Sequence, residues 1–242
     1  MTEWPRGYGL KWHDEIDSTN EEARRLAVGG ETGPLWLTAA RQTAGRGRRG
    51  RSWDSPSGNL AATLLIRPDR SQSEWAQLSF VTAVAASDMT ARFAPEAQIA
   101  LKWPNDVLAD GKKLCGILLE TATGQALAIG IGVNLAHHPK DTEFPATSLA
   151  ALGVKPPTTE DALAVLATGF AKWYEVWRAE GFTAIREAWL ARAAGLGARI
   201  RARLASEERS GMFEGIDENG ALLLNEGFGR ASVLPAADIF FG

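Results

Sequence analysis

The spacing of apolar residues predicts a short helix near the start of the chain. In DSTNEEARRLAVGG, residues 17–30, the apolar positions follow a helical period, and a Gly-Gly pair ends the run. Ser18 or Thr19 is the expected N-cap, and Glu21 or Glu22 would complete a capping box. The first turn of this helix therefore brings hydroxyl and carboxylate side chains together.

Two buried strands and a long core helix are predicted next. The runs PLWLTAARQ (34–42) and NLAATLLIRP (59–68) are nearly continuous in apolar residues, as in strands that are covered on both faces. Residues 73–93 have the length and the apolar spacing of a core helix. Up to this point the order of elements is typical of an α/β or an α+β protein.

The pattern changes to short strands between residues 98 and 135. Turn signals at residues 104–106, Asp110-Gly111 and Thr123-Gly124 separate apolar runs of strand length. Short strands joined by tight turns pair with their neighbours, so this region is predicted to be an antiparallel meander.

The remainder of the chain predicts two helices and a second group of strands. Residues 158–181, opened by Thr159 with acidic residues in the first turn, and residues 182–195 have amphipathic helical spacing. From about Gly197, short alternating runs separated by turns predict a small SH3-like β-barrel.

Composition restricts the class of protein. The 242 residues, of which 45% are hydrophobic, can form one full domain and a small appendage. A net charge of -3 argues against a surface that broadly tracks nucleic acid. Cys115 is the single cysteine, so no internal disulfide is expected. No apolar run approaches membrane-spanning length and the first residues lack a signal-peptide pattern, so we expect a cytoplasmic protein without membrane association.

Positive charge is concentrated in AGRGRRGRSW, residues 44–53. Arg46, Arg48, Arg49 and Arg51 repel one another unless a negative group lies among them, so the sequence implies an anion. The glycines between them make the segment flexible. We therefore expect this basic loop to be mobile when empty and to become ordered around a phosphate or a carboxylate.

Other interpretations of the basic loop are weaker. Gly45, Gly47 and Gly50 match G-x-G-x-x-G, but a proline and a glycine follow where a dinucleotide-binding helix would have to begin. No G-K-[ST] ends the run, which excludes a Walker loop. A solvated charge cluster or a nucleic-acid tail stays an alternative, although the flanking strands and Trp53 place the loop close to the core.

A second set of polar residues occurs in LKWPNDVLADGKKLCGILLE. Lys102, Asn105, Asp106 and Lys113 fall within one hairpin. The simplest interpretation of Lys112 and Lys113 is a pair of hairpin-edge lysines that prevent aggregation. The neighbouring glycines favour a binding site instead, because glycine inside a strand often marks the close approach of a ligand.

These glycines are predicted to lie side by side. If the Thr123-Gly124 hairpin has a two-residue turn, Gly116 lies opposite the Gly130–Gly132 stretch. A strip of sheet without side chains can hold a flat, mostly apolar molecule, and Lys113 would reach one end of it.

Four motifs in sequence order resemble those of one family. DSTN, RQTAGRGRRGRSW, KWPNDVLADGKKLCGILLE and IGIGVNL are similar to motifs of bacterial biotin protein ligases, and the resemblance extends from Ser18 to the C-terminal end. It implies an α+β fold with a mixed, largely antiparallel central sheet and packed helices, as in class II synthetases, over residues 1–196. Residues 197–242 would form the SH3-like barrel.

The resemblance also implies a two-step reaction. Biotin and ATP would give biotinyl-5′-adenylate and pyrophosphate, and the biotinyl group would then pass to a lysine of a biotin carboxyl carrier protein, such as that of acetyl-CoA carboxylase. Repulsion between a carboxylate and a triphosphate dominates the barrier of the first step. Cationic side chains and Mg²⁺ would relieve that repulsion.

The family roles transfer to three groups of residues. The catalytic group consists of Lys113, Arg48 and Arg51. The biotin-binding group consists of Ser18, Thr19, Asn20, Gln42, Gly45, Arg46, Gly47, Arg48, Lys113, Gly116, Gly130 and Gly132. The group for ATP and the adenylate consists of Arg46, Arg48, Arg51, Trp53, Asn105, Asp106 and Asn134. No metal site made by protein side chains is expected, because the three histidines are scattered.

Three further expectations concern partners and unassigned residues. Only seventeen residues precede Ser18, too few for the DNA-binding domain of some family members, so no repressor role is expected. Related enzymes pair edge to edge through the central sheet, and these strands permit a homodimer. Cys115 is expected to be a small buried strand residue, and Trp173, Trp177 and Trp189 are expected to pack helices.

Three alternatives to this function stay open. A lipoate or octanoate ligase would share the catalytic fold and would adenylate lipoate instead of biotin. A non-enzymatic RNA-binding module would show RNA affinity that falls steeply with salt. A phosphate-binding regulatory domain would bind nucleotide without turnover.

Overall fold

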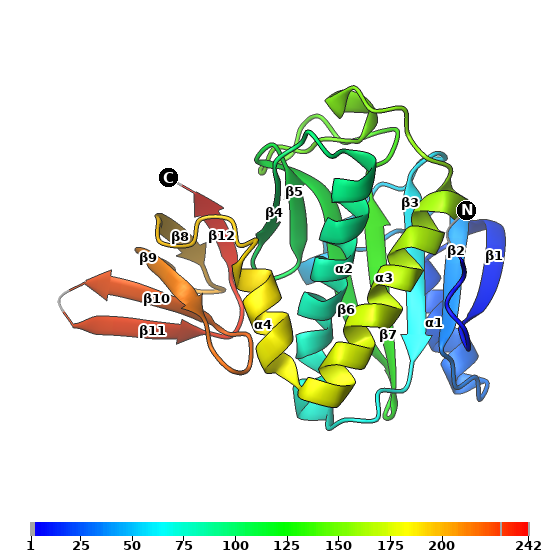
Figure 1. Cartoon of the computed structure of the whole chain (residues 1–242), viewed down its shortest axis with the longest axis horizontal. Coiled ribbons are helices and arrows are strands. Elements are labelled where there is room, and N and C mark those ends of the chain that lie inside the picture. The colour runs from blue at the N-terminus through cyan, green and yellow to red at the C-terminus, as the bar shows by residue number, and fades with distance from the viewer. Residues whose placement is uncertain (1–2, 228, 242) are drawn as a thin grey trace.

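Two β-sheets organise the chain, and the computed structural model describes residues 3–227 and 229–241. The larger sheet has seven strands in the order β1-β2-β3-β7-β6-β5-β4, and the smaller sheet has five in the order β11-β10-β9-β8-β12 (Figure 1). In chain order the elements are β1 (Gly9–Ile16), α1 (Thr19–Val28), β2 (Leu35–Gln42), the 3₁₀ turn η1 (Arg48–Gly50), β3 (Leu60–Ile66), η2 (Gln72–Gln77), α2 (Leu78–Phe93), β4 (Ile99–Lys102), β5 (Asp106–Ala109), β6 (Lys112–Thr123), β7 (Ala126–Val133), η3 (Ala150–Leu152), α3 (Thr159–Glu180), α4 (Phe182–Leu190), β8 (Arg199–Arg203), β9 (Glu208–Ile216), β10 (Leu222–Gly227), β11 (Arg230–Leu234) and β12 (Asp238–Phe241).

The α+β prediction is confirmed, including the mixed character of the large sheet. β1 pairs with β2 in parallel, and the other neighbouring pairs of the described strands are antiparallel. β1 is an element that the sequence analysis did not predict. It forms the outer edge of the sheet, where most of its side chains are exposed.

Helices cover both faces of the large sheet. α2 and α3 lie on one face and α1 lies on the other (Figure 1). α2 is buried along most of its length because it lies between the sheet and α3. Trp36 of β2 packs edge to face on Phe170 of α3, with the ring centroids 6.0 Å apart. The long apolar helix predicted at residues 73–93 begins with the turn η2 and continues as α2.

One predicted helix boundary is confirmed and another is wrong by a few residues. α3 begins at Thr159, as predicted, and the hydroxyl of its N-cap Thr158 accepts a hydrogen bond from the N–H of Asp161. α4 ends at Leu190, short of the predicted residue 195, because the chain beyond it leaves the helix to pair with Leu101 at the end of the large sheet.

A turn of the small sheet packs into the core of the first sheet. The carbonyl of Gly220 accepts a hydrogen bond of 2.9 Å from the indole of Trp103. Gly220 has φ +86°, and a Cβ there would lie 2.5 Å from Phe80 of α2. Glycine is therefore required both by the backbone conformation and by the close contact. This contact anchors the small sheet beside β4 and β5.

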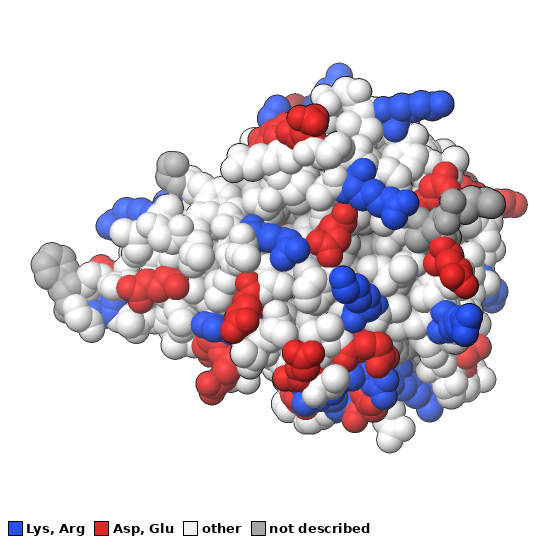
Figure 2. Space-filling model, in the orientation of Figure 1, with Lys and Arg blue, Asp and Glu red and all other residues white. Residues whose placement is uncertain are grey.

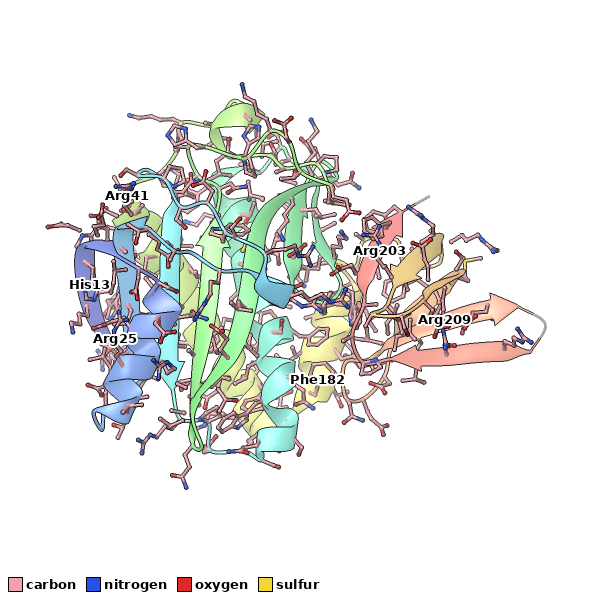
Figure 3. The ribbon with its side chains drawn as sticks, turned by 180° about the vertical axis from the view of Figure 1, so that it is seen from behind. His13, Arg25, Arg41, Phe182, Arg203 and Arg209 are labelled. Carbon is pink, nitrogen blue, oxygen red and sulfur yellow. The ribbon has the colours of Figure 1, made fainter. Side chains whose placement is uncertain are left out.

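Charged groups of both signs are interspersed over the face that carries α2 and α3 (Figure 2). Among the described helices, none is long and apolar enough to cross a bilayer. The opposite face of the large sheet carries α1 and the basic loop, which crosses the strands toward the small sheet (Figure 3).

Candidate active site

A cavity of about 470 Å³ lies on that opposite face, between the large sheet, the basic loop, the segment 139–146 and β12. Sixteen of the predicted site residues line it: Ser18, Thr19, Asn20, Gln42, Arg46, Gly47, Arg48, Arg51, Trp53, Asn105, Asp106, Lys113, Gly116, Gly130, Gly132 and Asn134. Gly45 lies outside this cavity and lines a shallower depression beside α1. The structure thus brings together residues that are more than 100 positions apart in sequence.

The floor of the cavity is the predicted strip of glycines. Gly116 of β6 pairs directly with Gly132 of β7, and Gly130 is the next residue of β7 on the same face. The indole of Trp53 lies over the first two glycines, since a Cβ would lie 2.9 Å from it at Gly116 and 2.3 Å at Gly132. The side chain of Asn20 lies over Gly130 in the same way. Only glycine leaves room for these two side chains.

Gln42 caps helix α1 in place of the predicted capping box. Ser18 is the N-cap residue, but its side chain makes no capping hydrogen bond. The carboxamide oxygen of Gln42 accepts hydrogen bonds from the N–H of Thr19 at 2.8 Å and from its hydroxyl at 3.0 Å. Glu21 instead pairs with arginines, among them Arg46 of the basic loop at 2.9 Å. The hydroxyl of Ser18 is therefore available to a ligand in the cavity.

Thr63 links the polar residues behind the floor. Its hydroxyl is fully buried and lies 2.6 Å from Oδ1 of Asn20 and 2.8 Å from Oγ1 of Thr19. The amide nitrogen of Asn20 donates to Glu120 at 2.7 Å. A buried network with its partners satisfied holds its members in one geometry. Sequence analysis missed Thr63 because an isolated threonine in an apolar strand carries no visible signal.

The basic loop closes on itself through Gly45. The N–H of Trp53 donates to the carbonyl of Gly45 at 2.9 Å, and Arg46 forms a β-bridge with Ser52. A Cβ on Gly45 would lie 2.4 Å from the carbonyl oxygen of Trp53. Gly45 therefore shapes the base of the loop, although it does not line the main cavity.

Protein carboxylates lie among the arginines of the loop. Asp238 of β12 receives hydrogen bonds of 3.0 Å from both Arg49 and Arg51. Arg48 donates to the side-chain oxygen of Asn105 at 3.1 Å. Asp238 and Glu21 thus supply part of the negative charge from within the chain, a source that the sequence analysis did not name. Ordering of the loop by a ligand stays a prediction.

Lys113 lies at the end of the glycine floor. Its Nζ is 2.7 Å from Oδ1 of Asp106, which pairs across the sheet with Gly116. The same ammonium lies 5.5 Å from the centre of the Trp53 ring. Lys113 is thus a cation held beside an apolar, flat surface.

Two predicted site residues also have structural contacts. The amide nitrogen of Asn134 donates to the carbonyl of Thr147 at 3.0 Å and Asn134 is almost fully buried. Asn105 donates to the carbonyl of Ile117 at 2.5 Å. Cys115 is buried, as predicted, and burial raises the pKa of its thiol, so it is not a reactive group.

The cavity also contains residues that the sequence analysis did not assign to it. Lys102, Phe144, Asp238 and Phe240 all line it. Asp238 and Phe240 come from the small sheet, so no local motif could have indicated them. Lys102 was singled out with Asn105, Asp106 and Lys113, but the sequence analysis gave it no role in the site.

Comparison with known proteins agrees with this geometry. Residues 13–135 match the biotin/lipoate A/B protein ligase family, and residues 195–242 match the biotin protein ligase C terminal domain. The chain belongs to the biotin/lipoate A/B protein ligase family and is therefore a ligase. Membership of a ligase family excludes the two non-enzymatic alternatives, the RNA-binding module and the phosphate-binding regulatory domain.

Within that family the chain groups with the biotin protein ligases. It is 48% identical over 236 residues to the biotin–[acetyl-CoA-carboxylase] ligase of Paracoccus denitrificans, covering 93% of this chain and 98% of that protein. It is 35% identical to the bifunctional ligase/repressor BirA of Bacillus subtilis (strain 168), over 98% of this chain and 75% of that protein. The biotin protein ligase of Aquifex aeolicus in complex with biotin and ATP has the same fold, with a TM-score of 0.85, 26% identity, and coverage of 97% of this chain and 99% of that one.

Proposed function

We propose that this ligase activates biotin with ATP and attaches it to a lysine of a biotin carboxyl carrier protein. In the first step a carboxylate oxygen of biotin attacks the α-phosphorus of ATP, the bond to the β-phosphate breaks, and pyrophosphate leaves. In the second step the neutral amine of the acceptor lysine attacks the acyl carbon and AMP leaves. The amine loses one proton, which Asp106 or the adenylate phosphate accepts.

The main support for this proposal is the position of Lys113 at the end of the glycine floor. A cation beside a side-chain-free floor can bind the carboxylate of a molecule that lies flat on that floor. Lys113 then neutralises the attacking carboxylate and, with Arg48 and Arg51, offsets the charge that develops at the α-phosphate. The ion pair between Lys113 and Asp106 would break as the ligands bind.

The polar end of the cavity suits the ureido ring of biotin. Ser18, Thr19, Asn20 and Gln42 offer both donors and acceptors at the N-terminus of α1, as a ring with one carbonyl and two N–H groups requires. Gly116, Gly130 and Gly132 leave space for the bicycle and the chain. Because the indole of Trp53 lies over two of these glycines, we infer that it moves aside when biotin binds and then packs against the adenylate.

The loop residues would close over the reacting groups. Gly45, Arg46, Gly47 and Arg48 form the segment nearest the carboxylate and phosphate, and Asn105, Asp106 and Asn134 lie on the nucleotide side. The mixed anhydride would be hydrolysed by water, so a closed loop also protects it. The loop would close when its arginines leave Asp238 and Glu21 and bind the phosphates instead.

Mg²⁺ would enter as part of the Mg·ATP substrate. In the described part of the chain, no three acidic, histidine or cysteine side chains are grouped as a metal site. Mg²⁺ is commonly held by phosphate oxygens with one or two protein groups, and Asn105 and Asp106 are the residues placed to contribute.

Three wider features belong to the same proposal. Residues 1–196 would form the catalytic domain and residues 197–242 the C-terminal domain. The ion pairs of Asp238 with Arg49 and Arg51 would connect the two domains. A homodimer would form through the open edge of the central sheet, where β1 lies, and sedimentation with and without biotin and ATP tests it. An enzyme that uses ATP and modifies carboxylases is expected in the cytoplasm.

The direct test is transfer of labelled biotin to a purified carrier domain, with and without ATP. Lys113→Met should lower pyrophosphate release by roughly a hundredfold or more, the scale for loss of one group that stabilises transition-state charge. Lys112→Met, at the exposed neighbouring position, is the matched control and should be near normal. Lipoate in place of biotin distinguishes the alternative substrate. Transfer without ATP, or preference for lipoate, would overturn the proposal.

A further inference from the structure

Lys102 is a buried ammonium at the cavity wall that has no role in the mechanism above. It is the last residue of β4, only 7% of its surface is exposed, and it lines the cavity. Its Nζ lies 3.5 Å from the ring centre of Phe144 and 5.6 Å from that of Phe240. No hydrogen bond or ion pair joins this nitrogen to any residue within 3–227 or 229–241.

Such an ammonium is costly for the folded protein. Burial of a cation without a hydrogen-bonded counter-charge is unfavourable, and contact with aromatic faces offsets only part of that cost. Burial, together with the charges of Lys113 and Arg51, lowers the pKa of Lys102 to about 8 against the opposing effect of Asp106 and Asp238. A bound anion would supply the missing partner.

The place of Lys102 in the sheet indicates which anion. The glycine floor lies on β6 and β7, whereas Lys102 lies on β4 and pairs with Asp106 of β5. From Lys113 on β6, the strand of Lys102 is two strands farther toward the small sheet, about 10 Å at the usual strand spacing. Arg51 lines the same cavity, and its charge acts on Lys102. A triphosphate that has its α-phosphorus at Lys113 can span this distance.

We propose that Lys102 binds the terminal phosphates of ATP and the pyrophosphate that leaves. This inference rests on the proposed function, since it assumes that the α-phosphate lies at Lys113. The ammonium would donate to oxygens of the β- or γ-phosphate, and the arrival of the polyanion would replace a costly buried charge with a paired one. The competing occupant of this region is the adenine ring, which could stack on Phe144.

The test measures inorganic pyrophosphate directly. Biotin-dependent exchange of labelled pyrophosphate into ATP gives the KM for pyrophosphate, and Lys102→Met removes the charge while keeping a flexible side chain that suits the aromatic surroundings. We expect this KM to rise by roughly tenfold to a hundredfold, with the KM for biotin unchanged. We also expect a higher melting temperature, because a buried unpaired charge is removed. Lys102→Gln is a second variant with the same expected effect on exchange, and Lys112→Met is the control.

The possible outcomes separate this inference from the proposed function. If the wild-type protein shows no biotin-dependent exchange, the proposed function fails and this inference fails with it. If the wild type exchanges and both Lys102 variants keep its KM for pyrophosphate, only the role of Lys102 is overturned. Weaker binding of the biotinyl-adenylate with unchanged affinity for pyrophosphate would also overturn it and assign Lys102 to the adenine.

Discussion

Asp238 accepts a 3.0 Å hydrogen bond from Arg51, although 187 positions separate the two residues in the sequence. Arg49 donates to the other oxygen of the same carboxylate. The small sheet therefore holds the basic loop of the large sheet by a carboxylate at the start of β12. If the phosphates of ATP compete with Asp238 for the same guanidinium groups, as the proposed function requires, this contact would couple the C-terminal sheet to nucleotide binding.

Asp238→Asn should release the loop. The variant keeps the shape of the side chain but removes the charge that attracts two arginines, so amide hydrogen exchange in residues 45–53 should become faster. Glu208→Gln is the control, because Glu208 pairs with Arg201 in the same small sheet and does not contact the loop. Equal exchange of the loop in the wild type and in Asp238→Asn would show that the ion pairs do not hold it.

The same contact predicts a dependence on pH. Burial alone would raise the pKa of Asp238, but the hydrogen bond from Arg51 and the nearby guanidinium charges outweigh it, so the pKa lies below its usual value. A lowered carboxylate pKa stabilises the folded contact above the unfolded value of about 4, and the effect is lost as the pH falls through the folded value. Loop protection, corrected for intrinsic exchange, should therefore be constant from pH 7 to about pH 5 and decline only below about pH 4. A decline near pH 6 would contradict this assignment.

Much of the fold was predictable because apolar runs and turns are local signals. The meander from β4 to β7 and the pairing of Gly116 with the Gly130–Gly132 stretch follow from hairpin geometry. The turn itself was predicted one residue too early, because Thr123 pairs with Ala126 and the register shifts between Thr121 and Thr123. β1 was missed because an exposed edge strand buries little apolar surface, and its residues Leu10 and Trp12 remain 50% and 37% exposed. Its parallel pairing with β2 is a tertiary contact across α1.

Only those residues of the candidate site that lie within a sequence motif were predictable. The loop arginines, Lys113 and the floor glycines all lie in motifs, and the structure places them around one cavity. Asp238 and Phe240 depend on how the small sheet docks, which no local pattern encodes. Thr63 was not predictable, because its partners Thr19 and Asn20 come from another element.

Thr63→Val should weaken biotin binding without affecting ATP. Valine has nearly the same shape but removes the hydroxyl that contacts Thr19 and Asn20, so these side chains lose their fixed orientation. The KM for biotin should rise by roughly threefold to tenfold, the scale of one hydrogen bond, with the KM for ATP unchanged. Steady-state kinetics of adenylate formation measure both constants.

Two comparisons test whether the hydroxyl of Thr63 is responsible. Thr63→Ser should restore most of the affinity, because serine keeps the hydroxyl. Thr38→Val is the matched control, since Thr38 is a fully buried threonine of the neighbouring strand whose hydroxyl bonds to the backbone carbonyl of Ala61. Equal effects of Thr63→Val on the two KM values would show a general loss of structure rather than positioning of the biotin site.

Gly132→Ala should disturb both Trp53 and the floor of the site. The added methyl group would lie 2.3 Å from the indole, so Trp53 must move, and the strip on which biotin would lie is no longer flat. Overpacking of this kind costs about 1–3 kcal/mol. We expect the tryptophan emission of Gly132→Ala to differ from that of the wild type. This difference should disappear when Gly132→Ala is made in Trp53→Phe protein. We also expect a large rise in the KM for biotin. Gly124→Ala, where the added methyl meets nothing within 4 Å, should behave like the wild type. Normal biotin kinetics in Gly132→Ala would exclude the glycine strip as the binding surface.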